Sequence, residues 1–583
     1  MPGDLKAVTA DGEGAGSAGP EGRAAAIVGV LGAGTMGAGI AQLACRAGAQ
    51  TLLYDPIADA LAGGREKIAD GLRREAAKGR LTGEQAAEAE GRLTTVGELE
   101  ALAPCELVIE AVPERLELKH EIYARLSEIV ADDCVLATNT SSLPVTAIAA
   151  GATHPERVVG MHFFNPAPVM KLLEVIAGVR SGEAALALAR ATGVAMGKTV
   201  IDATDGPGFL VNRCNRPFGL EALRMLSEQI ASIEAIDRVV RMEGGFLMGP
   251  FELMDLVGVD TGFDVTKSFY ELSFGEPRWR PSPITARYAA AGLHGRKTGQ
   301  GYYDYSGASH RPDDPPPPEV AEPAEGVVVI AGEGVLADEL AAAASAAGYE
   351  VRSPHQPLGD ALPALFIDCS IGDEATGAAG PPASRAVRSA TGGGGPSSTS
   401  SLGSPTRAAP AHGGAHVVLC ARGSLSALDP GGSAVGFHVL PPFDGARLVE
   451  LTRADSSSPL VAQRAERFFA TLGKHTEWVG DAPGLVLGRI VCQVINESAF
   501  ALGEGVGSAR DIDLGMVLGL SHPRGPLEWA DAIGLDHVLA VLEALCAEYR
   551  EERYRPAPAL RRLVREGRFG AGAPGGGFHP GDG

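Results

Sequence analysis

A histidine and a glutamate twelve residues apart are the strongest candidates for chemistry in this sequence. His162 lies in the short apolar run Met161–Phe164, and Glu174 lies in a second apolar run. Pro166 and Pro168 end the first run and predict a turn, so the second run can return beside the first. A carboxylate facing a buried imidazole fixes the tautomer that a general base needs. A core histidine near a solvated glutamate gives the same pattern, so the pair alone leaves both interpretations open.

A glycine motif predicts a nucleotide site. The apolar strand Ala24–Val30 runs into Gly32-Ala33-Gly34-Thr35-Met36-Gly37 and a helix of small residues, and the next strand, Thr51–Tyr54, ends on Asp55. In a βαβ unit these glycines permit a tight turn and the close approach of a pyrophosphate, which a helix N-terminus favours. An acid at position 55 accepts hydrogen bonds from both ribose hydroxyls and repels a 2′-phosphate. NAD is therefore favoured over NADP.

Two further apolar strands are predicted at Leu107–Val112, which contains Glu110, and at Cys134–Thr138, which runs into Ser141. Ligands bind at the ends of parallel strands, so both side chains are site candidates. Ser141 is alternatively only a helix N-cap.

The charged stretch Leu61–Glu90 has helical periodicity. Its cations either meet the anionic tail of a substrate or form a solvated face, and the sequence leaves both open. These cations are Arg65, Lys67, Arg73, Arg74 and Lys78.

The composition is that of a large, acidic globular chain. At 583 residues the chain predicts about three or four domains. A formal net charge of −22 disfavours nucleic acids and anionic membranes as partners. No apolar run reaches membrane-spanning length, and the first 22 residues lack the features of a signal peptide, so we expect a cytoplasmic protein. The eight cysteines form no CxxC pair, which predicts reduced, mostly buried thiols and no zinc site of the usual spacing, and we predict no metal ligands.

The sequence repeats itself at an offset of 276 residues, which places His438 and Glu450 as a second histidine–glutamate pair. The apolar strand Val327–Ile330, followed by Gly332-Glu333-Gly334, is a degenerate form of the nucleotide-binding motif. The same offset relates Asp205 to Asp481, Pro207-Gly208 to Pro483-Gly484, Asp237 to Asp513, Gly249-Pro250 to Gly525-Pro526, and Asp260 to Asp536. The second half is therefore predicted to be a second copy of the first.

The predicted fold class is α/β, a Rossmann-type domain followed by an all-α domain, with the pair repeated as a degenerate second copy. The predicted parts are a disordered tail (1–22), a Rossmann NAD-binding domain (23–205), a helical domain (206–306), a Pro-rich linker (307–325), a degenerate Rossmann-like domain (326–480) with a low-complexity insertion (377–414), and a second helical domain (481–583).

Six motifs between about residues 24 and 305 resemble those of L-3-hydroxyacyl-CoA dehydrogenases. The matching segments are Gly32–Gly37 with Asp55, Asn139–Leu143, His162–Pro166, Pro207–Arg213, Gly249–Glu252 and Arg296–Gly299. In that family an NAD-binding domain precedes a helical domain, and the acyl-CoA lies in the cleft.

The resemblance implies a role for each matching residue. His162 resembles the family's catalytic base, and Glu174 resembles the partner of that base. Ser141 and Asn212 resemble the residues that hold the substrate's oxygens. Ser141 and Asn165 are also implied on the cofactor side, together with Glu110 and Lys297.

The implied function is reversible NAD-dependent oxidation of (S)-3-hydroxyacyl-CoA to 3-oxoacyl-CoA, in fatty-acid or aromatic-acid catabolism. The resemblance extends to long, duplicated bacterial members of the family, which act on 3-hydroxyadipyl-CoA or 3-hydroxybutyryl-CoA. A non-catalytic NAD- or acyl-CoA-binding protein is the alternative, although a pure binder has no need for the full set of catalytic residues. A hydratase is not expected, since the second half repeats the dehydrogenase.

The second copy lacks several of the polar residues that the dehydrogenase motifs use for chemistry. Pro441 stands at the position related to Asn165, and Gly488 at the position related to Asn212. We therefore predict that the first copy catalyses and the second is structural, and a second acyl-CoA site remains the alternative. Such a chain is expected to be a monomeric pseudo-dimer or a homo-oligomer.

Overall fold

The computed structural model describes residues 22–319, 324–357, 363–371, 415–571, 573 and 575–579. The described residues divide into two compact units: those within 22–212 and 505–520 form the first, and those within 213–504 and 521–579 form the second. Nearly all of the predicted tail and the whole predicted insertion, 377–414, lie outside the described residues.

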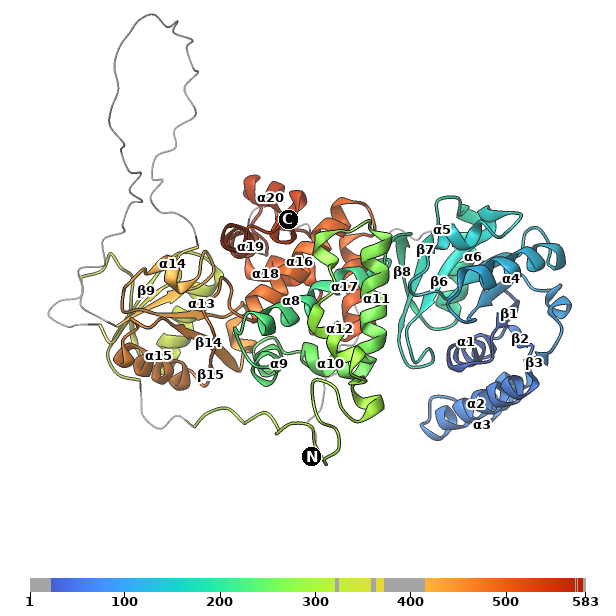
Figure 1. Ribbon diagram of the computed structural model, residues 1–583, viewed down its shortest axis with the longest axis horizontal. Helices are drawn as coiled ribbons and strands as arrows, with labels where there is room; N and C mark the ends of the chain where they lie inside the picture. The colour runs from blue at the N-terminus through green and yellow to red at the C-terminus, as the bar shows by residue number, and fades with distance from the viewer. Residues whose placement is uncertain are drawn as a thin grey trace, which may run out of the picture. The chain divides into compact units, whose positions relative to one another are not determined.

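An eight-stranded sheet organises the first unit (Figure 1). Its order is β3 (Leu93–Val96), β2 (Gln50–Tyr54), β1 (Ile27–Leu31), β4 (Leu107–Glu110), β5 (Val135–Thr138), β6 (Val158–Phe163), β7 (Leu172–Ala177) and β8 (Thr199–Thr204). Neighbouring strands run parallel except β6 and β7, which are antiparallel. The central strands are almost continuously apolar because helices cover both faces.

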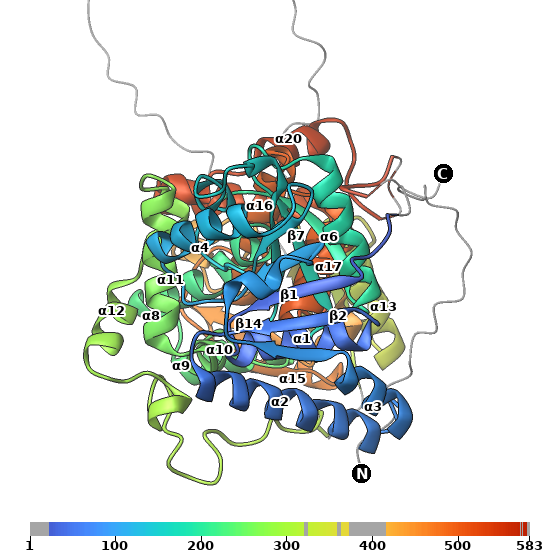
Figure 2. The same cartoon turned by 90° about the vertical axis from the view of Figure 1, so that its right-hand side faces the viewer.

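Helices of the first unit share the sheet's hydrophobic core. The helices are α1 (Thr35–Arg46), α2 (Ala58–Ala77), α3 (Gly83–Gly91), α4 (Leu116–Ile129), α5 (Val145–Ala149) and α6 (Glu183–Ala195), and the short α7 (Val211–Cys214) spans the boundary to the second unit. Buried residues of α1, α2 and α6 pack together with β1 and β4 to β7 in one core. The outer helices α2 and α3 lie beyond α1 (Figures 1 and 2).

One helix of the first unit comes from far along the chain. Helix α17 (Ala509–Leu520) packs on β7 and β8. Its Gly515 faces Val211 and Ile201, and the N–H of Thr204 donates to the carbonyl of Val506 at 3.0 Å. Residues 505–520 therefore complete this unit.

The second unit holds a seven-stranded sheet of matching order. The order is β10 (Glu350–Arg352), β9 (Val327–Ala331), β11 (Leu365–Asp368), β12 (His416–Leu419), β13 (Val435–His438), β14 (Leu448–Arg453) and β15 (His475–Trp478). Strands β13 and β14 form the antiparallel pair, and His438 lies opposite Glu450, as His162 lies opposite Glu174 in β6 and β7. This correspondence suggests a repeat.

The remaining described helices also belong to the second unit. They are α8 (Arg216–Ser227), α9 (Ile233–Met242), α10 (Pro250–Val257), α11 (Val259–Leu272), α12 (Pro283–Ala290), α13 (Val335–Ala347), α14 (Leu425–Leu428), α15 (Pro459–Thr471), α16 (Leu487–Gly503), α18 (Pro526–Ile533), α19 (Leu535–Tyr549) and α20 (Pro558–Arg565). Helix α9 packs on β14, as α17 packs on β7 and β8. Helices α8 and α16 pack against each other.

Two buried arginines join the α8 and α16 regions reciprocally. Arg213 and Glu221 are related to Arg489 and Glu497 by the 276-residue offset, and each arginine pairs with the glutamate of the other set. The contacts are Arg213 to Glu497 at 2.9 Å and Glu504 at 2.8 Å, and Arg489 to Glu221 at 3.0 Å and Glu228 at 2.7 Å. In a two-fold symmetric dimer, each contact across the interface occurs twice, with the two partners exchanged between the subunits. The arginine–glutamate pairs follow this pattern.

The connection from β2 to β4 in the first sheet is much longer than the corresponding connection from β10 to β11 in the second sheet. Residues 55–106 join β2 to β4 and include α2, α3 and β3, whereas residues 353–364 alone join β10 to β11. The second sheet therefore has no room for a counterpart of α2 and α3. None of the described helices combines the length and apolar character that crossing a membrane requires.

Candidate active site

The two strands β6 and β7 bring His162 and Glu174 together. Their registered positions face each other, and Nδ1 of His162 lies 2.6 Å from Oε2 of Glu174. The histidine is 6% exposed and the glutamate 0%, which excludes the alternative of a solvated glutamate. A bond at Nδ1 leaves Nε2 as the nitrogen that can exchange a proton with a substrate.

The other oxygen of Glu174 is fixed by the backbone. Oε1 accepts the N–H groups of Leu210 at 3.2 Å and Val211 at 3.0 Å. The rings of Phe164 and Phe209 lie 4.7 Å and 5.8 Å from the imidazole and hold its plane. The carboxylate is therefore oriented from both sides.

Ser141 and Asn212 each follow a residue that is tied to this pair. Asn139, two residues before Ser141, accepts the N–H of Phe163, the neighbour of His162, at 2.8 Å. Asn212 directly follows Val211, whose N–H holds Glu174. Ser141 is exposed and Asn212 is half-buried. Ser141 is not a helix N-cap, because Pro144 occupies the N-cap of α5.

The glycine turn has the shape that a dinucleotide needs. At Gly32, φ is +94° and a Cβ would lie 2.7 Å from the carbonyl oxygen of Ala111. A Cβ at Gly37 would lie 1.8 Å from the carbonyl oxygen of Gly32, so α1 can approach β1 only without a side chain there. Gly34 is exposed, with nothing within 4 Å of its Cβ position, and no side chain caps α1. The N-terminus of α1, which begins with Thr35 and Met36, is thus open to a phosphate.

Asp55 lies at the end of β2 beside this turn. Its Oδ2 accepts the N–H of Ala33 at 2.9 Å, and its Oδ1 accepts the N–H of Ile57 at 3.0 Å. The acid therefore reaches the glycine motif itself, where the adenosine ribose of a dinucleotide lies.

Glu110 anchors a charged group that sequence reasoning missed. Its oxygens lie 2.9 and 2.8 Å from Nζ of the buried Lys119 and also accept from Thr138 and the N–H of Val112. Lys119 in turn pairs with Glu114 at 3.1 Å.

Glu114 links this group to the Ser141 loop. Its Oε1 accepts the N–H of Ser141 at 3.0 Å, the N–H of Ser142 at 3.1 Å and the hydroxyl of Thr140. Burial raises the pKa of Glu114, but Lys119 and these donors outweigh it and lower the pKa below its usual value. The sequence offered one signal, since Glu114 follows the end of β4, where ligands bind in parallel sheets.

The other two predicted site residues lie elsewhere. Asn165 is exposed on the turn that follows β6. Lys297 belongs to the second unit, where its Nζ donates to Asp260 at 2.7 Å.

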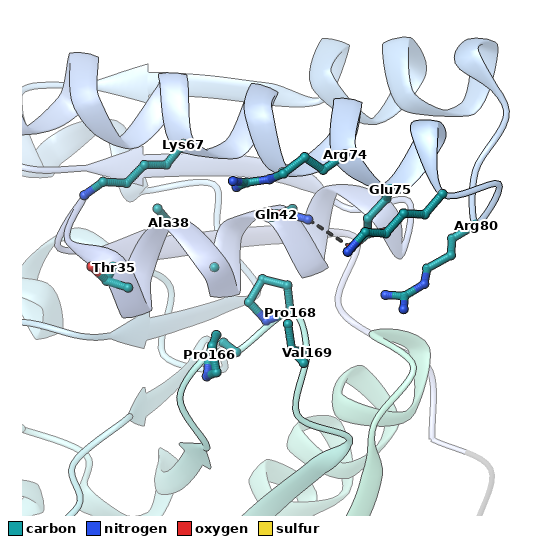
Figure 3. Close-up of a pocket in the computed structure, with 14 residues that line it drawn as sticks. Thr35, Ala38, Gln42, Lys67, Arg74, Glu75, Arg80, Pro166, Pro168 and Val169 are labelled. Atoms are coloured by element: carbon teal, nitrogen blue, oxygen red, sulfur yellow. Dashed lines mark hydrogen bonds between the residues drawn. The ribbon is translucent and has the colours of Figure 1, made fainter. Parts of the chain in front are cut away.

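A cationic cavity of about 280 Å³ lies between α1, α2 and the turn after β6 (Figure 3). Lys67, Arg74 and Arg80 line it (Figure 3), and so does Lys78, which directly follows α2. The acid in the lining, Glu75, is already paired with an arginine of α1 at 2.9 Å. Of the five cations predicted on this helical stretch, Lys67, Arg74 and Lys78 line the cavity. For these three, an anion-binding role agrees with the structure better than a solvated face. Such a site suits a ligand with several phosphates.

Two family models match the chain. The model of the 3-hydroxyacyl-CoA dehydrogenase NAD binding domain matches residues 27–206, which contain the eight-stranded sheet. The model of the 3-hydroxyacyl-CoA dehydrogenase C-terminal domain matches residues 208–305 and again residues 484–579. The helical domain therefore occurs twice.

Known relatives extend this match over nearly the whole chain. The 3-hydroxyadipyl-CoA dehydrogenase of Escherichia coli (strain K12) is 34% identical over 542 residues, covering 92% of this chain and 96% of that protein. The 3-hydroxybutyryl-CoA dehydrogenase of Mycobacterium tuberculosis (strain ATCC 25618 / H37Rv) is 40% identical over 280 residues, covering 48% of this chain and 98% of that protein.

A solved structure agrees with the sequence relatives. The crystal structure of 3-hydroxybutyryl-CoA dehydrogenase from Escherichia coli K12 has a TM-score of 0.74 and 31% identity, and covers 93% of this chain and 98% of that chain. The resemblance of the sequence motifs is thus confirmed. The chain belongs to the 3-hydroxyacyl-CoA dehydrogenase family, and its cofactor is NAD.

Proposed function

We propose that this chain reversibly oxidises (S)-3-hydroxyacyl-CoA to 3-oxoacyl-CoA with NAD, and that His162 is the general base. The observation that carries the proposal is the buried pair of His162 and Glu174 at 2.6 Å, on the same sheet as the glycine turn. A protein that only binds nucleotides has no need of an imidazole oriented in this way.

His162 takes the hydroxyl proton on Nε2, since Nδ1 is held by Glu174. NAD, when bound, would supply the acceptor for the hydride from C3. Loss of the hydroxyl proton to His162 and of this hydride together converts the C–O single bond into C=O. Glu174 stabilises the imidazolium and is itself held by two backbone N–H groups. Ser141 and Asn212 hydrogen-bond the substrate's oxygens and hold C3 in line.

The residues around the glycine turn fit the cofactor. We assign the pyrophosphate to the turn of Gly32, Gly34 and Gly37 at the N-terminus of α1, and the adenosine ribose to Asp55. Glu110 is assigned a supporting role, because its oxygens bind Lys119. Glu114 and Lys119 then join Ser141 and Asn165 on the cofactor side.

The cationic cavity beside α2 is assigned to the phosphate-bearing end of CoA. Lys67, Arg74, Lys78 and Arg80 supply the charge. The turn that contains Pro166 and Pro168 forms the other wall, and this turn directly follows the strand that holds the base.

Two relatives are named for 3-hydroxyadipyl-CoA and 3-hydroxybutyryl-CoA, and we propose substrates of these classes, within fatty-acid or aromatic-acid catabolism. A comparison of rates with acetoacetyl-CoA and with longer and dicarboxylic 3-oxoacyl-CoA substrates chooses between them.

We infer that the second half is a degenerate copy without dehydrogenase activity. A Cβ at residue 488 would lie 2.2 Å from the ring of His438, so the backbone of Gly488 packs against the imidazole where a substrate would lie. The cavity beside its second glycine turn, at Gly334, is about 10 Å³, room for about one water molecule. Residues 353–364 stand where α2 and α3 stand in the first half, and the described ones among them form no counterpart of α2 that could bind CoA.

The reciprocal pairs of Arg213 with Glu497 and of Arg489 with Glu221 support a pseudo-dimer. On this proposal, the helical domain of the second half takes the place that a second, identical subunit would take in a two-fold symmetric dimer. We therefore propose that the full chain is a monomer.

The decisive variant is His162→Ala. We expect turnover to fall by roughly 10²- to 10⁴-fold, because proton transfer loses its base. Binding of NADH, measured by fluorescence titration, should be unchanged. His154→Ala is the matched control, because this partly exposed histidine lies on the loop before β6.

The same experiment tests the second half. One NADH per chain and less than one hundredth of the activity in His162→Ala would agree with a single working site. Retention of about half the activity would identify a second working site, and full activity would contradict the proposed mechanism.

A further inference from the structure

A buried cluster of three metal-ligand side chains lies in the second unit. Glu243, His438 and Glu450 each offer one ligand atom, and these atoms lie within 4.8 Å of one another. His438 and Glu450 are 0% exposed, and Glu243 is 6% exposed. Strands β13 and β14 supply the histidine and one glutamate, and the residue that ends α9 supplies the other.

Glu243 has no counterpart in the first unit. The 276-residue offset relates it to Gly519 at the end of α17. A Cβ at Gly519 would lie 2.8 Å from Leu172 and 3.2 Å from Phe164, so this position lies next to the strand pair of the catalytic histidine. A carboxylate is thus added at only one of the two related positions.

The cluster has too much potential negative charge for a dry interior. Glu450 accepts the N–H groups of Val486 at 2.7 Å and Leu487 at 2.9 Å. Glu243 accepts the N–H of Leu440 at 3.2 Å through Oε1, and its Oε2 has no hydrogen-bond partner within the described part of the chain. Two adjacent buried carboxylates cannot both be ionised unless a proton or a cation lies with them.

The hydrogen bonding of the His438 ring leaves one nitrogen available as a metal ligand. Nε2 of His438 lies 3.3 Å from Nε2 of His537, and Nδ1 has no hydrogen-bond partner among the residues that the structure describes. When the ring carries its proton on Nε2, it donates to His537 and Nδ1 presents a lone pair. Outer partners of this kind orient the histidine ligands of metal sites.

We propose that Glu243, His438 and Glu450 bind one divalent transition-metal ion of the Zn²⁺ or Mn²⁺ class. One imidazole nitrogen and two carboxylate oxygens are ligands that these ions accept. The ion cancels both carboxylate charges and gives a partner to Nδ1 of His438. Its role is structural, because it ties the end of α9 to β13 and β14.

The test measures metal in the full-length protein. Because the site is buried, the ion must enter during folding, so the protein is produced in medium with added ZnCl₂ and separately with added MnCl₂. After dialysis against EDTA, mass spectrometry of the metal should give about one equivalent per chain from at least one medium. Glu243→Gln keeps the size and the hydrogen bonds of the side chain and should hold less than one fifth of an equivalent.

Two controls make the result specific. Glu543→Gln removes an exposed carboxylate from the same unit and should hold as much metal as the parent. Circular dichroism verifies the folding of Glu243→Gln, and Glu450→Gln serves as a second variant of the cluster. The metal-loaded parent should melt several degrees above the metal-free parent, a difference that both cluster variants should lose.

The proposal is overturned if the parent holds less than one fifth of an equivalent from both media. It is equally overturned if both cluster variants hold as much metal as the parent. The third overturning outcome is a parent that holds no metal and melts at a lower temperature than Glu243→Gln. This result would identify a proton shared by the two carboxyl groups in place of a metal ion.

Discussion

His162 and His438 occupy equivalent positions in two strand pairs, but their neighbours differ. Nδ1 of His162 binds Glu174 at 2.6 Å, whereas Nδ1 of His438 has no hydrogen-bond partner within the described ranges. The ring of His438 packs against Gly488, the position related to Asn212. We infer that a few side chains around a retained imidazole, and not the imidazole itself, separate a catalytic site from a structural one.

Asp55 should determine the choice of cofactor. We expect strong preference of the parent for NADH over NADPH, because the carboxylate repels a 2′-phosphate. Asp55→Ala should reduce this preference by at least tenfold, measured as the ratio of kcat/KM for the two cofactors. Asp59→Ala removes an exposed acid nearby and should leave the ratio unchanged. Equal use of both cofactors by the parent would refute the assignment.

Sequence motifs found most of the candidate residues at this scale, but they missed Glu114 and Lys119. The reason is that these two act through a network. Lys119 contacts Glu110 and Glu114, and Glu114 in turn accepts from the loop of Ser141. Such a network joins residues from β4, α4 and the loop after β5, and spacing along the chain does not show it. The roles of the predicted site residues stay predictions.

At the scale of elements, the cations of the α2 region fall into two groups: those that line the cavity and those on the exposed side of the helix. Lys67, Arg74 and Lys78 line the cavity, whereas Arg73 pairs with Asp70 on the exposed side. Arg74→Glu should raise KM for acyl-CoA substrates at least tenfold with little change in KM for NADH, because a charge that attracts phosphate is reversed. Arg73→Glu is the matched control, and equal effects of the two variants would contradict a CoA site on this face.

Helix α9 carries a buried acid whose ionisation opposes folding. Asp237 accepts the N–H groups of Phe251 at 3.0 Å and Glu252 at 2.9 Å, and the hydroxyl of Tyr303 at 3.0 Å. Burial raises the pKa of Asp237 from 3.8 to about 7. The folded chain therefore keeps a proton that the unfolded chain loses, so this stabilisation is complete below about pH 4 and is lost as the pH rises through 7.

Asp237→Asn should flatten this dependence. Urea unfolding at about pH 5 and pH 7.5 should show a smaller decrease in the free energy of unfolding for the variant than for the parent. Asp264→Asn, at an exposed position, should behave like the parent. A variant with the same decrease as the parent would show that Asp237 is ionised throughout this range.

Local pattern predicted many elements to within a few residues. The strand expected at Ala24–Val30 is β1 (Ile27–Leu31), and the return of Glu174 beside His162 is the antiparallel pair of β6 and β7. The helical stretch expected at Leu61–Glu90 is two helices, because Gly79, with φ of +70°, separates α2 from α3. The packing of α17 on β7 and β8 could not be predicted, since it joins residues some 300 positions apart.

At the scale of the whole molecule, the second half should be indispensable. Removal of residues 326–583 would take away α16, which covers α8, and also α17, which completes the first unit. We expect the shortened protein to aggregate or to dimerise through the exposed face of α8. Size-exclusion chromatography with light scattering measures this, and a soluble, fully active monomer of the shortened protein would contradict it.

A matched deletion distinguishes this effect from shortening alone. Deletion of residues 377–414, the predicted low-complexity insertion, should leave a monomer with the activity of the parent.

The predicted domain boundaries also stay predictions. The compact units cut across them, because residues 505–520 lie with the first unit although their sequence belongs to the last predicted domain.

The reciprocal arginine pairs have a consequence for how the two halves can change. In a homodimer one gene encodes both sides of the interface, so every substitution occurs twice and the symmetry is kept. Here Arg213 and Arg489 belong to one chain, and their association does not depend on protein concentration. Each half can therefore mutate alone while the other stays functional. Glu243 and Gly519, which the 276-residue offset relates, are a difference that a homodimer could not hold, because one gene would give both subunits the same residue.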